Sequence, residues 1–430
     1  MRFLLLLFTL LLSSISFGQS LDGPCLRIFD NPDEAFDIRR QVIINAKEEI
    51  VMSYYALANE VRPMNILRLL KEAVDRGVKV RLLLDDYNSK LPTEMRAFLK
   101  NNHIETRFYN VLKIKNIGRI DRRMHDKYVV IDRKYLLVGG RNLKDGYFKL
   151  KVKEEQTFYD LDVLLTGQPA IEAADYFEER WVSPLAEERV IKKINEDKYT
   201  DLEEKIFRTY DEIEALDGMS LSDEKAALSE CQDTSFYAYD PNDKLDNESI
   251  QDIYIREIEN AQTSIDIQNA YVILTKPMQK AIRAAAERGV RVRIVTNSLK
   301  TADVTMSYSA FRNLRPKLMK WGVEIYEFTQ NDTLHTKLAI FDNKRFIVGS
   351  FNLDPRSANI NSETIILSGD KQHAELIQEF YDETLELSAR INEKGRHEGT
   401  NKRHPGTTFG KRLLNSILRF TLVPILRGRL

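Results

Sequence analysis

The sequence has little of several features that would define a protein class. Its 430 residues include only 2 cysteines, 12 prolines and 18 glycines. Two cysteines are too few for a disulfide framework or a cysteine-built zinc site, and so little proline and glycine fits neither a collagen nor a linker protein. The net charge is also small, −1, because 64 Lys and Arg nearly balance 65 Asp and Glu. No global positive field therefore attracts nucleic acid or acidic lipid. A hydrophobic content of 43% instead predicts domains with buried cores.

Long hydrophobic runs are scarce as well. The N-terminal run from Phe3 to Leu12 follows an arginine and leads to small residues that end at Gly18. This pattern is typical of a secretory signal peptide, so we expect cleavage after residues 1–18 and export to the periplasm or another extracytoplasmic membrane face. An uncleaved N-terminal anchor is the alternative, although the run is shorter than the roughly 20 residues that span a bilayer. In an oxidising compartment Cys25 and Cys231 either pair or remain as two thiols.

The chain contains an internal repeat. AVDRGVKVRLLLDD, from Ala73, resembles AAERGVRVRIVTNS, from Ala285, and two further blocks match at separations of 215 and 210 residues. Each copy reads as an amphipathic helix that ends at a glycine and is followed by a buried strand. We therefore predict an α/β fold of two duplicated lobes with mostly β sheets. The predicted segments are a first lobe over 26–185, a charged helical connection over 186–235, a second lobe over 236–390 and a tail over 391–430.

Two of the six histidines stand at matching positions in the repeat. Since residues two apart in a strand face the same way, each imidazole is expected beside a lysine ammonium group. An aspartate follows each histidine by seven residues, where the strand ends, so it either forms a turn or contributes charge to the site. The two motifs are His125-x-Lys127-x4-Asp132 and His335-x-Lys337-x4-Asp342.

A second strand follows each motif and leads to small residues and an asparagine. Small residues let a ligand approach the backbone, and asparagine can donate hydrogen bonds to phosphoryl oxygens. Two later carboxylates are candidates to hold the imidazole Nδ1 protons, with an ordinary strand carboxylate as the alternative. The residues are Gly140, Asn142, Ser350 and Asn352 for phosphate binding, and Asp160 and Glu363 for the imidazoles.

Two imidazoles, two ammonium groups and two amides in one cleft would suit a phosphodiester. A neutral imidazole attacks phosphorus, an opposed imidazolium protonates the departing alkoxide, and the lysines stabilise charge on the non-bridging oxygens. This chemistry needs no metal ion or cofactor. Because the ordinary pKa of histidine is about 6.5, a bell-shaped rate profile near neutral pH is expected.

These residues resemble the phospholipase D superfamily, whose members have paired motifs of this kind. The strings RRMHDK, VGGRN, DLDV, TNSL and VGSFNLDPRSANINSE are similar to the bacterial cardiolipin synthase branch, in particular its C-type subgroup. The resemblance implies a two-lobed α/β fold with the active site between the lobes and a phosphohistidine intermediate. It further implies that His125 is the nucleophile and His335 the general acid and base, although the two assignments are interchangeable on the sequence alone. The implied partners are phospholipids, phosphatidylglycerol first and phosphatidylethanolamine as a further candidate.

The last 40 residues carry nine Lys or Arg and two Glu. From Lys411 the segment KRLLNSILRFTLVPILRGRL places most apolar residues roughly on one helical face. A basic amphipathic segment of this kind favours an anionic membrane surface, and Pro424 and Arg419 argue against a membrane span. The alternative is a terminal helix docked on the core.

We therefore expect an exported, membrane-associated phosphatidyltransferase of the cardiolipin synthase type. A hydrolytic phospholipase D that releases phosphatidic acid would use the same residues. A nuclease of the same superfamily is disfavoured by the balanced charge, so nucleic acid is not an expected partner. A non-enzymatic lipid-binding protein is disfavoured because both motifs are complete. The donor and acceptor lipids and the oligomeric state do not follow from the sequence.

Overall fold

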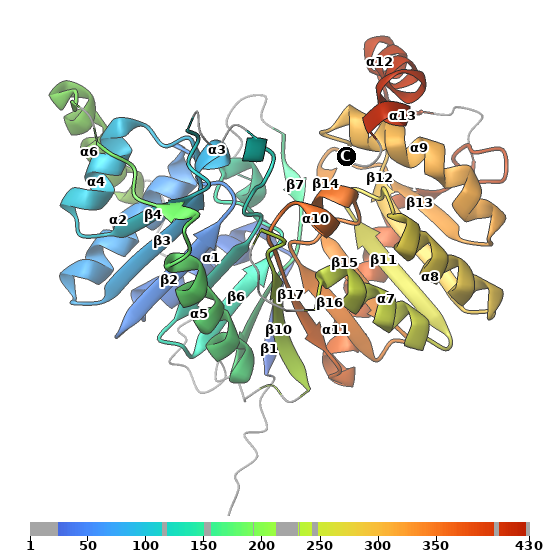
Figure 1. Cartoon of the computed structure of the whole chain (residues 1–430), viewed down its shortest axis with the longest axis horizontal. Coiled ribbons are helices and arrows are strands. Elements are labelled where there is room, and N and C mark those ends of the chain that lie inside the picture. The colour runs from blue at the N-terminus through green and yellow to red at the C-terminus, as the bar shows by residue number, and fades with distance from the viewer. Residues whose placement is uncertain are drawn as a thin grey trace, which may run out of the picture.

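The computed structural model describes residues 25–113, 118–149, 156–191, 193–211, 231, 233–242, 248–399 and 404–426. The predicted signal peptide, residues 1–18, lies outside this part of the chain. The described residues form two lobes side by side, each built on one eight-stranded mixed sheet (Figure 1). The two-lobed α/β fold predicted from the repeat is confirmed.

The two sheets have matching strand orders. The first runs β1-β8-β6-β5-β2-β3-β4-β9 and the second β10-β17-β16-β15-β11-β12-β13-β18. In the first sheet β2, β3 and β4 are parallel, as are β11, β12 and β13 in the second. The strands of the first sheet are β1 Leu26–Phe29, β2 Glu49–Tyr54, β3 Lys79–Asp85, β4 Glu105–Tyr109, β5 Lys127–Ile131, β6 Tyr135–Gly139, β8 Asp162–Thr166 and β9 Ala186–Glu187. Those of the second are β10 Thr234–Tyr239, β11 Ser264–Asn269, β12 Arg291–Asn297, β13 Glu324–Phe328, β15 Lys337–Phe341, β16 Arg345–Gly349, β17 Glu363–Ser368 and β18 Ser388–Arg390.

Helices cover both faces of each sheet. In the first lobe α1, α2 and α4 pack on the outer face, and in the second α7, α8 and α9 do so. Between the two sheets α5 and α11 share one hydrophobic core with strands of both lobes (Figure 1). The helices are α1 Pro32–Ile44, α2 Val61–Asp75, α3 Asp86–Ser89, α4 Thr93–Asn101, α5 Gln168–Trp181, α6 Glu196–Asp211, α7 Ile250–Asn260, α8 Lys276–Glu287, α9 Thr305–Lys320, α10 Pro355–Asn359, α11 Lys371–Glu386, α12 Phe409–Phe420 and α13 Leu422–Leu426, with a short 3-10 helix, η2, at Asp145–Phe148.

The repeated helix–strand units form as their periodicity predicts. Helices α2 and α8 turn apolar residues towards the sheets, and each is followed by a glycine that begins the connection to the next strand. Gly77 has φ of +90° and Gly289 has φ of +86°, a backbone conformation that favours glycine. The strands that follow, β3 and β12, are buried along most of their length, as parallel strands covered on both faces are.

Besides the shared core, strand pairing and a disulfide join the lobes. A two-stranded parallel ladder links β7 Phe158–Tyr159 of the first lobe to β14 Thr333–Leu334 of the second. A single bridge links Met124 to Ser362 in the same sense. A disulfide joins Cys25, before β1, to Cys231, before β10, so the two lobes are also linked covalently.

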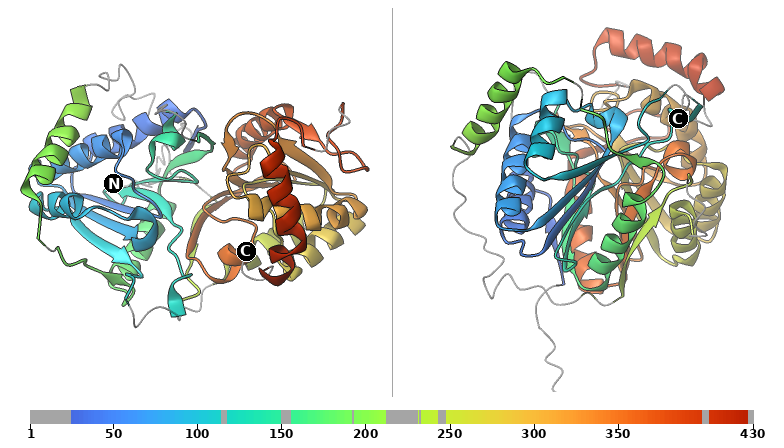
Figure 2. Two further views of the ribbon diagram at one scale, coloured as in Figure 1. Left: turned by 90° about the horizontal axis from the view of Figure 1, so that it is seen from above. Right: turned by 60° about the vertical axis from the view of Figure 1, so that its left-hand side comes forward.

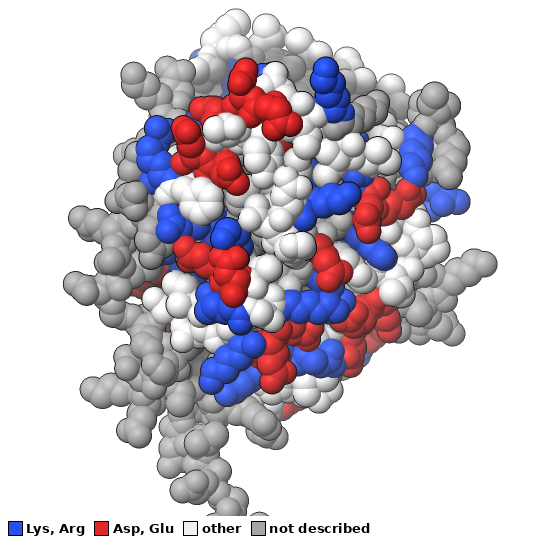
Figure 3. Space-filling model, turned by 90° about the vertical axis from the view of Figure 1, so that its left-hand side faces the viewer, with Lys and Arg blue, Asp and Glu red and all other residues white. Residues whose placement is uncertain are grey.

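The surface shows no large patch of one charge on the face drawn in Figure 3, where basic and acidic side chains alternate over the first lobe. Within the described ranges, every helix is either too short or too polar to cross a bilayer.

Candidate active site

Both motif histidines lie at the junction of the lobes. His125 stands two residues before β5 and His335 two residues before β15. The backbone N–H of His125 donates to the carbonyl of Ser362, and that of His335 donates to the carbonyl of Tyr159, at 3.1 and 2.8 Å. Each histidine is therefore hydrogen-bonded to the backbone of the opposite lobe.

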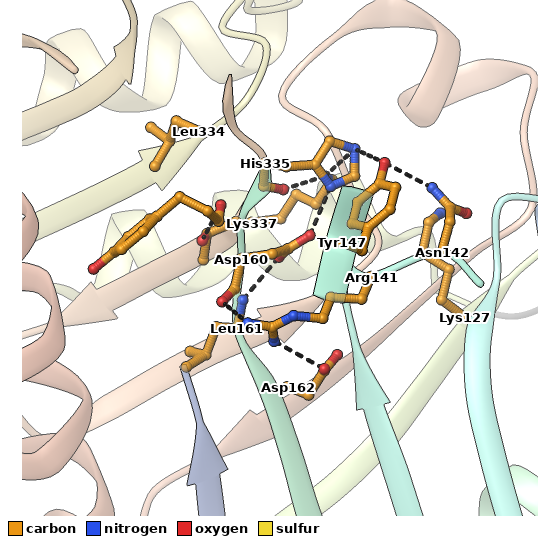
Figure 4. A network of polar contacts seen from close by, with 12 residues as sticks. Lys127, Arg141, Asn142, Tyr147, Asp160, Leu161, Asp162, Leu334, His335 and Lys337 are labelled. Carbon is orange, nitrogen blue, oxygen red and sulfur yellow. Dashed lines mark hydrogen bonds and ion pairs between the residues drawn. The ribbon is translucent and has the colours of Figure 1, made fainter. Parts of the chain in front are cut away.

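The imidazoles are held by carboxylates that also come from the opposite lobe. His125 Nδ1 lies 2.9 Å from Glu363 Oε2, and His335 Nδ1 lies 2.7 Å from Asp160 Oδ2. Figure 4 shows the second pair, with Arg141 beneath it donating to the Asp160 carbonyl at 2.6 Å. The sequence predicted that these two carboxylates serve the imidazoles. It did not show that each serves the histidine of the other lobe.

Asp160 and Glu363 occupy equivalent positions in the two sheets. Gly139, the last residue of β6, pairs with Asp162, and Gly349, the last residue of β16, pairs with Ile365. Asp160 and Glu363 each lie two residues before the paired residue of their own lobe. The interval from histidine to carboxylate nevertheless differs, because the first lobe has a longer loop after β6. This difference hides the equivalence in the sequence.

The small residues after the second strand support the carboxylates. A Cβ atom at Gly140 would lie 2.3 Å from Asp160 Oδ1, so only glycine fits there. At the equivalent position Ser350 Oγ donates to Glu363 Oε2 at 2.5 Å. Both residues were expected to contact phosphate. The structure places them against the carboxylates, where they position the acidic groups, and their contact with phosphate stays a prediction.

The two motif lysines are buried beside their histidines. Lys127 Nζ donates to the carbonyl of His125 at 2.5 Å, and Lys337 Nζ donates to the carbonyl of His335 and lies 2.9 Å from its Nδ1. Burial lowers the pKa of Lys127 to about 7 and that of Lys337 to about 8, against the opposing effect of nearby carboxylates. An anionic ligand in the site would favour the charged form of both lysines.

The two asparagines take different positions. Asn142 Nδ2 donates to the hydroxyl of Tyr147 at 2.9 Å, and that hydroxyl lies 3.3 Å from His335 Nε2 (Figure 4). Asn352 lines the cavity described below. The amide oxygens of both are buried, and neither has a hydrogen-bond partner in the described part of the chain.

Of the two roles that the sequence allowed for the motif aspartates, the structure shows turn formation, and their assignment to the catalytic residues is wrong. Asp132 and Asp342 lie at the far ends of β5 and β15, five residues after the lysines, which is about 16 Å along an extended strand. Asp132 and Asp342 both have positive φ, 51° and 55°, as do the residues that follow them, which is the conformation of the two central residues of a type I′ turn. The carboxylate of Asp132 accepts hydrogen bonds from three successive backbone N–H groups, beginning at Lys47. Asp342 does the same for residues 262–264.

Replacing Asp342 with alanine is therefore expected to reduce stability without removing activity. The three backbone N–H groups lose their acceptor, and by analogy with helix caps the cost is about 1–2 kcal/mol. Urea unfolding measures the first effect, and turnover of phospholipid by the folded fraction measures the second. A large loss of turnover at unchanged stability would instead return Asp342 to the site.

Burial and the two lysines set the protonation of the imidazoles. Burial, followed by Lys127 and Lys337, holds the pKa of His125 well below its usual value. Burial and Lys337 also lower the pKa of His335, to about 4, although Asp160 opposes the shift. Both rings are therefore neutral in the unliganded protein near pH 7, and a negatively charged ligand is needed to favour an imidazolium.

The two carboxylates differ in charge. Burial raises the pKa of Glu363 to about 7, against Lys127 and Ser350, which lower it. Burial alone would raise the pKa of Asp160 as well, but His335 and Lys337 outweigh it and the value falls to about 2. His335 thus faces a carboxylate that is ionised near neutral pH, whereas His125 faces one that titrates there.

A cavity of about 350 Å³ opens beside His125. Its walls include the ring of Tyr55, which meets the His125 ring edge-on at 4.7 Å between centroids, and Arg356 of α10. His335 lies outside the cavity lining and is enclosed by the stacked rings of Tyr147 and Phe158. The other lining residues are Tyr271, Val304, Met306, Ser307, Asn352, Asp354 and Asn361.

The motif reasoning assigned no role to Tyr55 or Arg356. Tyr55 follows β2 without any motif around it, so no sequence signal identifies it. Arg356 lies within the VGSFNLDPRSANINSE string, so its sequence context is a signal for it. A guanidinium at the cavity wall adds a donor for an anionic ligand.

One group of potential metal ligands exists in the described ranges, and it lies away from this site. Cys25, Asp370 and His373 come within 4.8 Å of one another. The sulfur of Cys25 is already bonded to Cys231.

The fold and the site together define a class. Two imidazoles, each oriented by a carboxylate from the other half of a duplicated α/β chain and accompanied by a buried lysine, form a phosphodiester-processing site of the phospholipase D type. A family model described as "Cardiolipin synthase, PLD-like domain" matches residues 40–181 and 254–385. The chain belongs to this phospholipase D-like family, and it is an enzyme of that superfamily.

Individual relatives agree with this membership. The chain is 29% identical to cardiolipin synthase C of Escherichia coli (strain K12) over 437 residues, which cover 89% of this chain and 91% of the relative. It is 30% identical over 390 residues to an uncharacterised protein of Helicobacter pylori (strain 26695), covering 80% and 77% of the two chains. Among solved structures, the phosphatidylserine synthase of Haemophilus influenzae superposes with a TM-score of 0.71 at 16% identity, covering 94% of this chain and 95% of that one. This last likeness shows the fold.

Proposed function

We propose that the protein transfers a phosphatidyl group between phospholipids through a phosphohistidine, as a cardiolipin synthase of the C type. The observation that carries the proposal is that the carboxylate of each lobe binds the histidine of the other lobe. This arrangement places two oriented imidazoles and two buried lysines at one junction. The family membership supports phospholipids as the substrate class.

In the proposed first step, Nε2 of neutral His125 attacks the phosphorus of phosphatidylglycerol. A P–N bond forms, the P–O bond to the glycerol headgroup breaks, and His335 gives a proton to the departing alkoxide. In the second step the hydroxyl of a second phosphatidylglycerol gives its proton to His335 and attacks the same phosphorus. The P–N bond breaks, cardiolipin forms and His125 is regenerated. Phosphatidylethanolamine is a further candidate donor.

The asymmetry of the two pairs supports this division of roles. His125 lines the cavity and its pKa is held well below the usual value, which keeps its lone pair available. His335 faces ionised Asp160, which stabilises an imidazolium once the substrate phosphate offsets the charge of the lysines. Because one phosphate ester replaces another, the exchange needs little net free energy.

The titration of Glu363 predicts an acidic limb in the rate profile near pH 7. While Glu363 is ionised it accepts the Nδ1 proton of His125 and leaves Nε2 with a lone pair. When Glu363 is protonated it donates to Nδ1, so the ring proton moves to Nε2 and the nucleophile is lost. We expect Glu363→Gln to lower kcat and to remove this limb. An unchanged limb in the variant would show that another group titrates.

The same shift predicts how Glu363 contributes to stability. Its pKa rises on folding from an ordinary value of 4.5 to about 7, so the folded protein binds more protons between these pH values and stability falls as pH increases through them. Glu363→Gln should flatten this part of the stability curve, which unfolding in urea at several pH values measures.

Membrane binding through the C-terminal helices is part of the proposal. Helix α12 packs on α9 with its polar side: Asn415 is its one buried residue, and its side-chain oxygen accepts from Ser309 at 2.9 Å. Its apolar side faces outwards, with Phe409 73% and Phe420 76% exposed. The helix itself lies on the outside of the second lobe (Figure 2). A helix docked to complete the core would instead bury its apolar side and expose its polar side. An anionic membrane surface accounts for exposed apolar side chains beside basic ones.

The position of α13 supports a link between membrane binding and the active site. Val423 is buried against Ile273 and Ala310, and Met306 packs on the same cluster. Met306 also lines the cavity beside His125. A membrane touching these helices would therefore lie near the cavity opening, where lipid enters.

Replacing Phe420 with serine is expected to weaken binding to vesicles that contain phosphatidylglycerol by about 30-fold. Full burial of a phenylalanine side chain contributes about 2 kcal/mol, and this one is mostly exposed in the protein, so its loss should not disturb the fold. Cosedimentation measures the binding, and Tyr87→Ser, at an exposed aromatic residue of the first lobe, is the matched control. Equal binding of the two variants would contradict the membrane role of α12.

We further propose that the protein is exported. The N-terminal sequence pattern predicts a signal peptide, and the Cys25–Cys231 disulfide supports an oxidising compartment. N-terminal sequencing of the mature protein tests cleavage after Gly18, and a chain that begins at Met1 would contradict it.

Incubation with phosphatidylglycerol vesicles tests the reaction itself. Mass spectrometry should find cardiolipin, with free glycerol as the second product. Phosphatidic acid as the sole lipid product would assign hydrolysis instead, because water would then be the acceptor for the same intermediate.

A further inference from the structure

A second cavity, of about 560 Å³, lies on the outer side of the second lobe and shares no lining residue with the active-site cavity. It is bounded by the C-terminal half of α9, the loop after β18 and helix α12. Five of its lining residues are basic and one is acidic. They are Arg312, Arg315, Lys320, Lys394 and Arg419, with Glu393; Pro316, Met319 and Gly395 complete the lining.

Arg312 is the residue of this cavity whose side chain indicates a ligand. It is only 8% exposed, and its Nε is buried without a hydrogen-bond partner in the residues that the structure describes. Its neighbour Arg315 differs, because it donates to Glu327 and to the carbonyl of Gly395 and is thereby neutralised. A buried donor without a partner is costly, and an anion in the cavity could accept from this guanidinium and remove that cost.

A phosphoryl group fits the chemistry of this cavity. The guanidinium of Arg312 offers a planar set of donors that matches two oxygens of a phosphate. Lys320 and Lys394 are exposed at the cavity and add positive charge. Arg419 reaches the cavity from α12, where its Nε donates to Asn313 Oδ1 at 3.0 Å.

The same helix connects the cavity to an apolar surface. Arg419 directly precedes Phe420, and Ile417, 50% exposed, belongs to the same outward face of α12. A phospholipid has the matching arrangement, with an anionic phosphate next to acyl chains. A free phosphate ion would use the basic residues but not the apolar face.

We propose that this cavity, the Arg312 pocket, binds the phosphoryl group of an anionic phospholipid and is a second lipid site, separate from the active site. It anchors α12 to a lipid headgroup and adds a specific contact to the general attraction between basic residues and an anionic bilayer. The proposal does not rest on the reaction, since binding is measurable without turnover.

The test uses the full chain carrying His125→Ala, so that lipid is not consumed. Cosedimentation with phosphatidylcholine vesicles, with and without phosphatidylglycerol, is compared for this protein and for the same protein with Arg312→Gln. We expect Arg312→Gln to weaken binding to the phosphatidylglycerol vesicles about tenfold, because charge-assisted hydrogen bonds are lost. Arg283→Gln, which removes one exposed charge from α8 of the same lobe, should change binding less than about threefold.

A second arm separates lipid from free phosphate. Inorganic phosphate is added without vesicles, and the thermal unfolding midpoint is recorded. If Arg312→Gln loses a phosphate-induced rise but binds vesicles normally, the pocket takes free phosphate and the lipid assignment is wrong. If neither vesicle binding nor the phosphate response differs between the two proteins, the pocket is not an anion site.

The same experiments include controls that show whether the variants fold normally. Because Arg312→Gln removes a largely buried guanidinium whose Nε has no partner in the described residues, it should be at least as stable as its parent in phosphate-free buffer. Lys394→Gln, at an exposed loop position, tests the pocket without touching the core and should weaken vesicle binding about threefold. A destabilised Arg312→Gln together with a normal Lys394→Gln would assign Arg312 a structural role and overturn the proposal.

Discussion

Replacing His125 with alanine is expected to lower phospholipid turnover by roughly 10⁴-fold or more, because the reaction loses its nucleophile and no other ring takes its place. His335→Ala should cost about 10²–10⁴-fold, the usual contribution of a general acid. Brief reaction with phosphatidylglycerol labelled at phosphorus, followed by proteolysis at mildly alkaline pH and peptide mapping, locates the phosphatidyl group. The label is expected on the peptide that contains His125.

The control for this experiment is His103→Asn. His103 is exposed after α4 and has φ of 55°, a conformation that asparagine tolerates, so the variant should fold and turn over lipid normally. Label on the His335 peptide would reverse the two roles. Substantial turnover by His125→Ala would refute the phosphohistidine intermediate altogether.

The second large effect is expected from loss of the disulfide. Cys25 and Cys231 are 206 residues apart, and closing so long a loop restricts the unfolded chain. Chain-entropy arguments place the stabilisation at about 5 kcal/mol, and measured values for disulfides usually fall at about 2–4 kcal/mol. The double variant Cys25→Ser, Cys231→Ser should therefore unfold roughly 5 °C below the wild type.

The same comparison has an internal control. A reducing agent should lower the midpoint of the wild type and leave the double variant unchanged. Equal midpoints for the two oxidised proteins would show that the disulfide adds nothing to stability. Turnover by the double variant well below its melting temperature should be close to normal, since the side-chain contacts of Cys25 are with Cys231 and His373 and not with His125 or His335.

The fold was predictable because the duplication repeats a strong local pattern. Arg-Gly-Val-basic-Val-Arg marks the end of a helix and the start of a buried strand in both copies, and the structure has these elements as α2–β3 and α8–β12. The pairing of the cysteines was left open, since sequence carries no distance between Cys25 and Cys231. Packing of β1 and β10 in the shared central core brings their preceding residues together.

The site was predictable only in its repeated part. The histidines and lysines recur at one separation, which identified them. The matching separation also made Asp132 and Asp342 look functional, although their repetition reflects the same hairpin turn in each lobe. Asp160 and Glu363 share a place in the sheet but neither residue type nor spacing. Each of these carboxylates binds the histidine of the other lobe, and this contact depends on tertiary packing, which no local sequence pattern encodes.

The crossed carboxylates mean that neither lobe holds a complete set of reacting groups. Severed after α5, the N-terminal half would keep an imidazole without its acid and an acid without its imidazole. Two identical copies facing each other about a twofold axis would restore both pairs, so a homodimer of half-length chains is a workable forerunner of this architecture. In this chain the two carboxylates are no longer equivalent, because the pKa of Glu363 is raised to about 7 and that of Asp160 is lowered to about 2.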